Sequence, residues 1–305
     1  MSGSMLERAY DSDLAYSFRH SPIALVSGLL AALCIGAAVL APFIAPHDPF
    51  DLASLNLMDS FKPPAFMADG DFHYALGTDD QGRDLLSALM YGARISLLVG
   101  VSAVLFATVL GVAVGLVAGY AGGILDAVLM RIADVQLTFP AILIALLVDG
   151  VVTAVLPRAL HERLEIYVLI FAIGISRWPQ FARTVRGSTM VERGRDYVLA
   201  ARVIGLSAPR IMLRHILPNV TGPVLIIATL SLGLSILDEA TLSFLGVGLP
   251  ASQPSLGTLI RIGNGFLFSG EWWITIFPGI VLVVMVLSIN LLGDWLRDAL
   301  NPRLK

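Results

Sequence analysis

The sequence predicts an all-α polytopic membrane protein with six transmembrane helices. Of its 305 residues, 56% are hydrophobic and 14% are charged, and the mean hydropathy is +0.81. Soluble domains carry roughly 25% charged residues, so this chain is far too apolar for that class. The apolar residues also gather in blocks of about 20, the helix length that crosses a hydrocarbon core.

Six apolar blocks define the expected spans, at 23–45, 94–118, 125–149, 166–182, 223–246 and 273–293. Arg177 and Pro179 interrupt the end of the fourth block, which is the shortest. The only cysteine, Cys34, lies inside the first block, so no intrachain disulfide can form. Leu33 suits a lipoprotein cleavage site poorly, and we interpret the first block as a retained anchor.

Charge orients these spans. The segment between spans four and five carries seven arginines against Glu192 and Asp196: Arg183, Arg186, Arg193, Arg195, Arg202, Arg210 and Arg214. The segment between spans one and two is acidic, with Asp48, Asp51, Asp59, Asp69, Asp71, Asp79, Asp80 and Asp84 against Lys62 and Arg83. The positive-inside rule places the arginines in the cytoplasm. Arg8, Arg19, Arg297, Arg303 and Lys305 place both termini there too.

The expected organisation follows from the spans and their orientation. It comprises a cytoplasmic N-terminal segment (1–22), a first transmembrane helix (23–45), an extracytoplasmic acidic loop (46–93), a transmembrane core (94–296) with a cytoplasmic loop at 183–222, and a cytoplasmic tail (297–305). Seven arginines at mid-bilayer would cost on the order of 20 kcal/mol, so the basic loop lies outside the lipid.

Residues 195–219 are expected to form two short helices within the basic loop. Asp196 can cap the first helix, and Gly205 suits the left-handed residue that ends it. Ser207 can cap the second helix, which stops near Pro218. The residues alone leave two interpretations open: a projection that inserts into a groove of another protein, or a hairpin that lies on its own bundle.

Gly111, Gly115 and Gly119 recur every four residues in the second span. Such a stripe lets another helix approach closely. We favour static packing over a mobile contact.

Several stretches resemble one family of transporters. Ala200, Ala201 and Gly205, followed by "RHILPN" at 214–219, resemble the EAA loop of ABC-importer permeases. "LGTDDQGRDLLSALMYGARISL" (76–97), "MRIADVQLTFPAILIAL" (130–146) and "EATLSFLGVGLP" (239–250) are similar to the second permease subunit of the dipeptide/oligopeptide/nickel family, the DppC/OppC type. The motifs cover most of the chain from Leu76 onward.

This resemblance implies a type I ABC-importer permease of the bacterial inner membrane that carries di- or oligopeptides. The implied partners are a homologous permease, two ABC ATPases, an extracytoplasmic solute-binding protein and membrane lipid, without nucleic acid. ATP and Mg²⁺ belong to the ATPases, so the chain itself has no cofactor, no catalytic residue and no enzymatic activity. The implied ATPase-coupling residues are Tyr197, Leu199, Ala200, Ala201, Ile204, Gly205, Leu206 and Arg214.

Leu199 departs from the family pattern, which usually has Glu at this position. With Asp196 as the cap, such a Glu would complete a capping box, which Leu cannot do. Leu instead adds apolar area to a groove contact. Our hypothesis is that coupling survives with a less polar contact.

Asp238 and Glu239 are carboxylates inside the fifth span and therefore candidates for the translocation path. The five histidines, His20, His47, His73, His161 and His215, lack metal-ligand spacing, so no metal site is expected. The chain has no P-loop motif.

Two kinds of alternative stay open. The same type of complex imports nickel chelates, glutathione or other small solutes in this family. An ion-driven secondary transporter is a different class, which would need more ionisable residues deep in the spans. A membrane-embedded enzyme is a third option, but no cluster of His, Cys, Asp or Glu residues in the sequence supports it.

Overall fold

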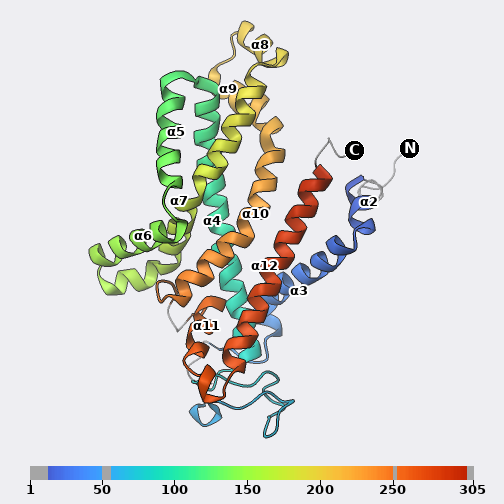
Figure 1. The fold of residues 1–305 in the computed structure, drawn as a ribbon, viewed down its shortest axis with the longest axis vertical. Coiled ribbons are helices and arrows are strands. Elements are labelled where there is room, and N and C mark those ends of the chain that lie inside the picture. The colour runs from blue at the N-terminus through green and yellow to red at the C-terminus, as the bar shows by residue number, and fades with distance from the viewer. Residues whose placement is uncertain (1–12, 50–55, 250–252, 301–305) are drawn as a thin grey trace.

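The computed structural model describes residues 13–49, 56–249 and 253–300, which form a bundle of helices (Figure 1). Arg8, Asp51, Pro250, Arg303 and Lys305, which entered the sequence argument, lie outside these ranges. The helices of the N-terminal half are α2 (Asp13–His20), α3 (Pro22–Ile44), η1 (Leu57–Asp59), α4 (Leu85–Ala121), α5 (Gly123–Leu137) and α6 (Ala141–Val155). The remainder are α7 (Arg158–Arg193), α8 (Asp196–Val203), α9 (Ala208–Ile211), η2 (Met212–Ile216), α10 (Leu217–Phe244), α11 (Leu256–Asn264), η3 (Leu267–Ser269) and α12 (Trp273–Leu300).

Four helical segments are long and apolar enough to cross a membrane: α3, α4, Ala208–Phe244 and Trp273–Ala299. The pair α5 and α6 makes a fifth candidate if the two count as one bent span. The expectation of an all-α polytopic membrane protein is therefore confirmed at the level of four or five candidate spans. α4 lies at the centre, packed against α3, α5, α7 and α10.

The third expected span, 125–149, is not one straight helix. α5 ends at Leu137, α6 begins at Ala141, and the two are bent by 92°. Pro140 stands at the break with φ −55° and ψ 135°. Proline is well tolerated at the start of a helix, and Pro140 is the N-cap residue of α6. α6 and the first part of α7 then project to one side of the bundle (Figure 1).

The fourth expected span, 166–182, lies inside the longer helix α7. Arg183, Arg186 and Arg193 therefore stand on a helix and not on a loop. Arg186 forms an ion pair with Asp126 at the start of α5 through a bond of 2.7 Å. Arg193 donates to the carbonyl of Tyr120 at 2.9 Å. The bond from Arg193 satisfies a carbonyl that the end of α4 leaves open, and the ion pair of Arg186 joins α7 to α5.

The glycine stripe of α4 faces α7 along its whole length. A methyl group on Gly111, Gly115 or Gly119 would lie within 2.4–2.7 Å of an atom of α7. At Gly115 that atom is the carbonyl oxygen of Ala182, at 2.5 Å. Backbone atoms cannot move aside cheaply, so the geometry is that of close packing.

The acidic loop, here residues 56–84, is tied to the bundle. Asp84 caps α4 by accepting from the backbone of Ser87 at 2.9 Å. Asp79 and Arg83 form a buried ion pair at 2.7 Å. Trp273 of α12 donates to the carbonyl of Thr78 at 3.1 Å. The loop is thus anchored to α4 and α12, although it carries many charges.

Gly115→Ala should lower the stability of the protein by about 1–3 kcal/mol, because the added methyl forces α4 and α7 apart. Gly187→Ala is the matched control: Gly187 is helical and has open space around its position. The free energy of unfolding of the Gly187→Ala variant should rise by up to about 1 kcal/mol, because Ala has a higher helix propensity than Gly. Thermal unfolding in detergent micelles measures both, and equal stability of the two variants would contradict static packing.

Asp80→Asn should raise stability at neutral pH. Burial raises the pKa of Asp80, helped by the nearby charge of Asp79, and its Oδ1 is buried without a hydrogen-bond partner. Because the pKa of Asp80 is higher in the folded chain than in the unfolded chain, ionisation of Asp80 lowers the stability of the protein as the pH rises from the unfolded pKa through the folded pKa. The advantage of Asp80→Asn should therefore shrink as unfolding is measured toward pH 4, and a gain that does not depend on pH would contradict it.

Candidate functional site: the basic hairpin and two intramembrane carboxylates

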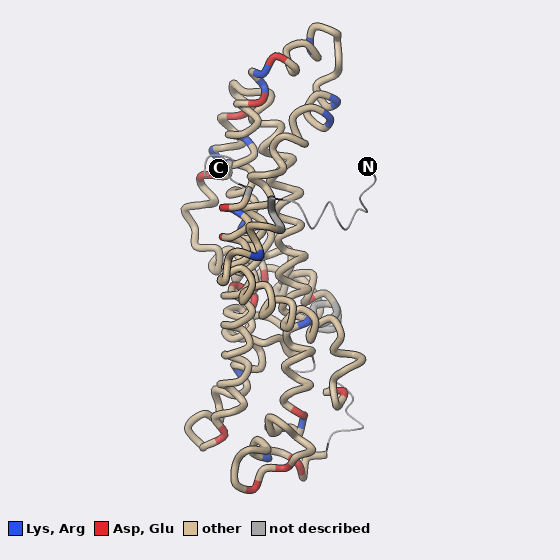
Figure 2. The backbone as a smooth tube through the Cα atoms, turned by 90° about the vertical axis from the view of Figure 1, so that its right-hand side faces the viewer, with Lys and Arg blue, Asp and Glu red and all other residues tan. Residues whose placement is uncertain are grey.

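The basic hairpin, residues 195–216, projects from one end of the molecule, with α8 at its tip (Figure 1). Figure 2 shows Lys and Arg positions along this end and mostly acidic positions in the loop at the opposite end. The hairpin combines α8, α9 and η2, and η2 runs directly into α10. It is continuous with the candidate span Ala208–Phe244.

The start of α8 differs from expectation. Arg195, with extended backbone, is the cap, and Asp196 is the first helical residue. The carbonyl of Arg195 accepts from Val198 and Leu199, and its side chain makes no capping bond. Only Gly194 and Arg195 separate α7 from α8, so the chain turns one residue earlier than expected. Leu199 is consequently not the third helical residue, and the capping-box explanation for a Glu there fails.

The end of α8 follows the expectation. Gly205 has φ +83°, the left-handed conformation that glycine adopts without strain. The backbone N–H of Leu206 donates to the carbonyl of Ala201 at 3.1 Å across this turn. Ser207 caps α9 with extended backbone and without a side-chain bond.

One face of the hairpin packs on the protein itself. Val198, Ala201, Ile211 and Ile216 are buried against Leu116, Val185 and Val220 of the long helices. Ala201 is 4% exposed, so its small side chain serves packing within the chain and offers no surface to a partner in this conformation. The interpretation of a hairpin that lies on its own bundle thus holds for these residues, and insertion into a groove of another protein stays a prediction for the exposed ones.

Other positions of the hairpin expose large apolar side chains. Leu199 is 45% exposed, Val203 88%, Ile204 78% and Leu213 60%; these four residues are the apolar crest. Ala200, Gly205 and Arg214 are also exposed, and Leu206 is half-buried. Val203 and Leu213 were not among the residues expected from the sequence to contact a partner. Helical spacing from Leu199 could have indicated Val203, which follows it by four residues.

Polar contacts join the hairpin to three long helices. The hydroxyl of Tyr197 donates to Glu192 of α7 and accepts from the amide of Asn219 of α10 at 3.0 Å. The guanidinium of Arg202 lies over the ring of Tyr120, at the end of α4, at 4.9 Å. Tyr197, expected to contact a partner, is therefore also bonded inward.

Asp238 forms an ion pair with Arg177, which joins α10 to α7. Arg177 donates twice to Oδ2 of Asp238, with the Nε bond at 3.0 Å. The two side chains are 9% and 17% exposed. From the sequence, Arg177 was expected only to interrupt the end of the fourth apolar block. Opposite charges in two apolar spans are the signal that could have paired them.

Glu239 is fully buried and lies among α4, α10 and α11. It accepts from Ser96 of α4 at 2.7 Å and from Ser243 of its own helix at 2.7 Å. Ser96 in turn accepts from the backbone of Leu256, where α11 begins, at 3.3 Å. Glu239 therefore holds helices together within this chain, and its burial does not support direct contact with a solute.

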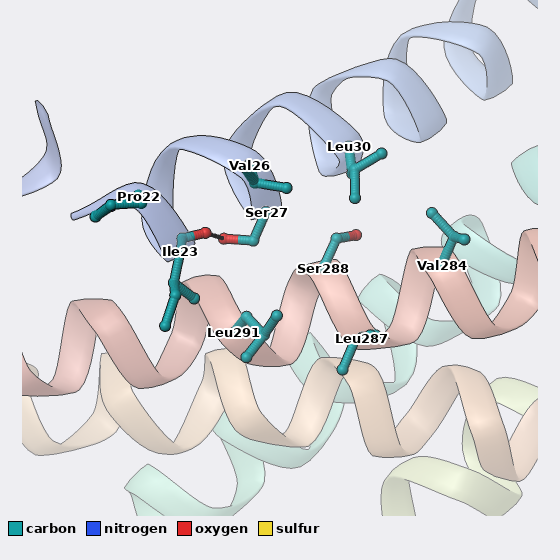
Figure 3. A pocket seen from close by; sticks show the side chains of 9 residues that line it. All are labelled: Pro22, Ile23, Val26, Ser27, Leu30, Val284, Leu287, Ser288 and Leu291. Atoms are coloured by element: carbon teal, nitrogen blue, oxygen red, sulfur yellow. Dashed lines mark hydrogen bonds between the residues drawn. The ribbon is translucent and has the colours of Figure 1, made fainter.

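Two hollows remain. A groove of about 360 Å³ between α3 and α12 is lined by apolar residues and two serines (Figure 3). The Ser27 hydroxyl is satisfied by the carbonyl of Ile23 at 2.7 Å, so the groove offers no free polar group from Ser27. A second hollow, about 410 Å³ at the bend between α5 and α6, includes Arg131 and Gln136. Asp134 lies 3.6 Å from Arg183 of α7.

Comparisons with known proteins agree with this architecture. Residues 111–305 match the family model for the binding-protein-dependent transport system inner membrane component, and residues 12–64 match that for the N-terminal TM domain of oligopeptide transport permease C.

Among curated relatives, the dipeptide transport system permease protein DppC of Haemophilus influenzae is 39% identical over 94% of this chain and 92% of its own length. The oligopeptide transport system permease protein OppC of Bacillus subtilis is 35% identical over 96% of this chain and 90% of its own length. A solved structure of the MetNI methionine ABC transporter is similar in fold, with a TM-score of 0.54 and 19% identity, over 70% of this chain and 96% of that chain.

Asp238→Asn should destabilise the protein by about 3–5 kcal/mol, because it leaves the charge of Arg177 buried and unpaired. Replacing both residues, Arg177→Met with Asp238→Leu, should recover most of this loss. Arg183→Met is the control, because its ion pair with Asp134 is more than half exposed and is worth less than about 1 kcal/mol. Unfolding in micelles measures all three, and a double variant as unstable as the single one would contradict the pairing.

Proposed function

The chain belongs to the family of binding-protein-dependent transport inner membrane components, as a permease of the DppC/OppC type, and we propose that it forms half of the path by which an ATP-driven importer carries di- and oligopeptides across the bacterial inner membrane. It is a multi-pass membrane subunit and not itself an ATPase. The observation that best supports coupling is the apolar crest, on a hairpin continuous with α10.

The proposed topology has six crossings. These are α3, α4, the bent pair α5 and α6, α7, α10 and α12. The basic hairpin lies in the cytoplasm with both termini, and the acidic loop lies on the outer face, as the positive-inside rule requires. α2 and the end of α12 lie toward the same half of the molecule as α8 (Figure 1), in support of this orientation.

In the proposed mechanism, the apolar crest enters a groove of the ATPase subunit. Leu199, Val203, Ile204 and Leu213 supply the buried apolar area, while the exposed Ala200 and Gly205 allow close approach. Exposed arginines such as Arg214 steer docking at the rim of the contact. Leu199, where the family usually has Glu, belongs to the apolar contact.

Movement of the ATPase would then pass into the spans through the inward bonds of the hairpin. Tyr197 connects it to α7 and α10, and Arg202 connects it to α4. α10 carries the movement toward the other end, where Asp238 and Glu239 join it to α7, α4 and α11. We therefore propose that these carboxylates transmit movement between helices. Asp238 is the more exposed of the two.

The proposed complex contains a homologous permease, two ABC ATPases that bind ATP and Mg²⁺, and an extracytoplasmic solute-binding protein. The pore lies between the two permeases. Peptides are the favoured cargo because the named relatives are dipeptide and oligopeptide permeases. Nickel chelates and glutathione are alternative cargoes, which binding assays on the solute-binding protein distinguish.

An ion-driven carrier is the alternative of a different class. The deep carboxylates argue against it, because Asp238 is paired with Arg177 and Glu239 is held by serine hydroxyls. Co-purification with an ATPase and ATP-dependent uptake by the reconstituted complex test the proposal. Uptake by the chain alone, driven by an ion gradient, would overturn it.

Val203→Asp should lower ATP-dependent uptake at least ten-fold and reduce co-purification of the ATPase, because a charge enters an apolar contact. The folded chain should be unaffected, since Val203 is 88% exposed. Leu199→Glu is the comparison within the same surface: the family usually has Glu at this position, so the groove should accept it and uptake should be largely retained. Wild-type uptake by Val203→Asp would remove the apolar crest from the contact.

Tyr197→Phe should separate docking from transport. The ring and its packing remain, while the bonds to Glu192 and Asn219 are lost. We expect the ATPase to co-purify normally and to hydrolyse ATP, while uptake per ATP falls several-fold. Loss of ATPase binding in this variant would instead place Tyr197 in the contact itself.

A further inference from the structure

Two histidines far apart in sequence meet at the surface of the acidic loop. His47 follows the end of α3, and His73 lies 26 residues further along the chain. Their Nε2 atoms are 3.0 Å apart, and their rings meet edge to face at 4.7 Å between centroids. The spacing of the histidines along the chain indicated no metal site, but the tertiary fold brings two imidazole nitrogens together.

From this geometry we propose that His47 and His73 form a surface site for a divalent transition metal ion, of which Zn²⁺ is the test case. Zinc–nitrogen bonds of about 2.0–2.1 Å place two tetrahedral ligands about 3.3–3.4 Å apart. The observed separation therefore needs to widen by only a few tenths of an ångström. Imidazole nitrogen selects zinc, copper or nickel over magnesium and calcium, which prefer oxygen ligands.

The surroundings of His47 favour a lone pair on its Nε2. This Nε2 forms a hydrogen bond with Nε2 of His73, so one of the two nitrogens carries a proton that the metal ion must displace. The backbone N–H of His47 donates to the hydroxyl of Ser87 at 3.0 Å. Its Nδ1 is buried, has no hydrogen-bond partner, and lies 3.7 Å from a carboxylate oxygen of Asp84. A proton on Nδ1, facing this carboxylate, leaves the lone pair on Nε2. Carboxylates behind metal-bound histidines orient them in this way.

His73 is also held from behind. Its backbone N–H donates to Asp71 at 2.9 Å, and Asp71 accepts from Lys62 at 3.0 Å. The ring of Tyr74 packs against both imidazoles, with centroids at 5.5 Å from His47 and 5.0 Å from His73. The two ligands are therefore positioned before any ion arrives, which lowers the entropic cost of binding.

The site is open. Among the described residues, no group of three or more His, Cys, Asp or Glu side chains could hold a metal ion. Water or a bound partner must therefore supply the remaining positions. His73 is exposed, and the acidic character of the loop attracts cations. A bound ion would cross-link the end of α3 to the loop before α4.

Titration of the purified full-length chain, carrying no histidine tag, with ZnCl₂ tests this site. Calorimetry should show saturable binding of one Zn²⁺ ion per chain with a submillimolar dissociation constant. The His73→Gln variant should lose this binding. Zn²⁺ should also raise the unfolding temperature of the wild type, since ligands that bind only the folded state stabilise it. MgCl₂ should do neither.

His215→Gln is the matched control, because it removes a histidine from the opposite end of the molecule. It should keep the wild-type affinity, while His73→Gln weakens binding at least ten-fold. His73 is exposed, so its variant should fold normally. Equal Zn²⁺ affinity in His73→Gln and the wild type, or no saturable binding by the wild type, would overturn the proposal.

Discussion

The cost of an unpaired polar group in an apolar environment governs this structure. Arg177, Asp238 and Glu239 lie within long helices of the bundle, and each is satisfied by a group on another helix. Because these bonds exist only in the assembled bundle, they define which helices lie together. α10 carries both carboxylates side by side, one facing α7 and the other α4 and α11. α10 is therefore bonded through polar side chains to α7, α4 and α11.

The same helix connects the two ends of the molecule. At one end α10 is continuous with η2 and α9, without an intervening loop. At the other, the start of α11 lies so close to α10 that a methyl on Gly257 would meet the carbonyl of Ala240 at 2.3 Å. We propose that a displacement of the hairpin passes along this continuous helical segment across the bundle. The tight packing of α4 against α7 gives this route a fixed frame.

Local properties were predictable. Gly205 takes the left-handed conformation, as its place at the end of a short helix indicated. The face of α8 was not predictable from composition, because Ala201 turns inward and Val203 outward. Which side of a short helix is buried depends on the helices beneath it. The cap of α8 moved by one residue for a similar reason, since the end of α7 sets where the turn begins.

The membrane class, the approximate positions of the apolar blocks and the family could all be read from the chain, because length, hydropathy and motif order are local properties. The cost of arginine in lipid also predicts that the basic segment lies outside the bilayer. Which distant groups meet depends on the tertiary structure. Arg177 pairs with Asp238 across 61 residues, Ser96 with Glu239 across 143, and His47 with His73 across 26. The turn at Pro140 likewise sent α6 sideways. Such contacts arise from helix packing, which no local pattern in the chain encodes.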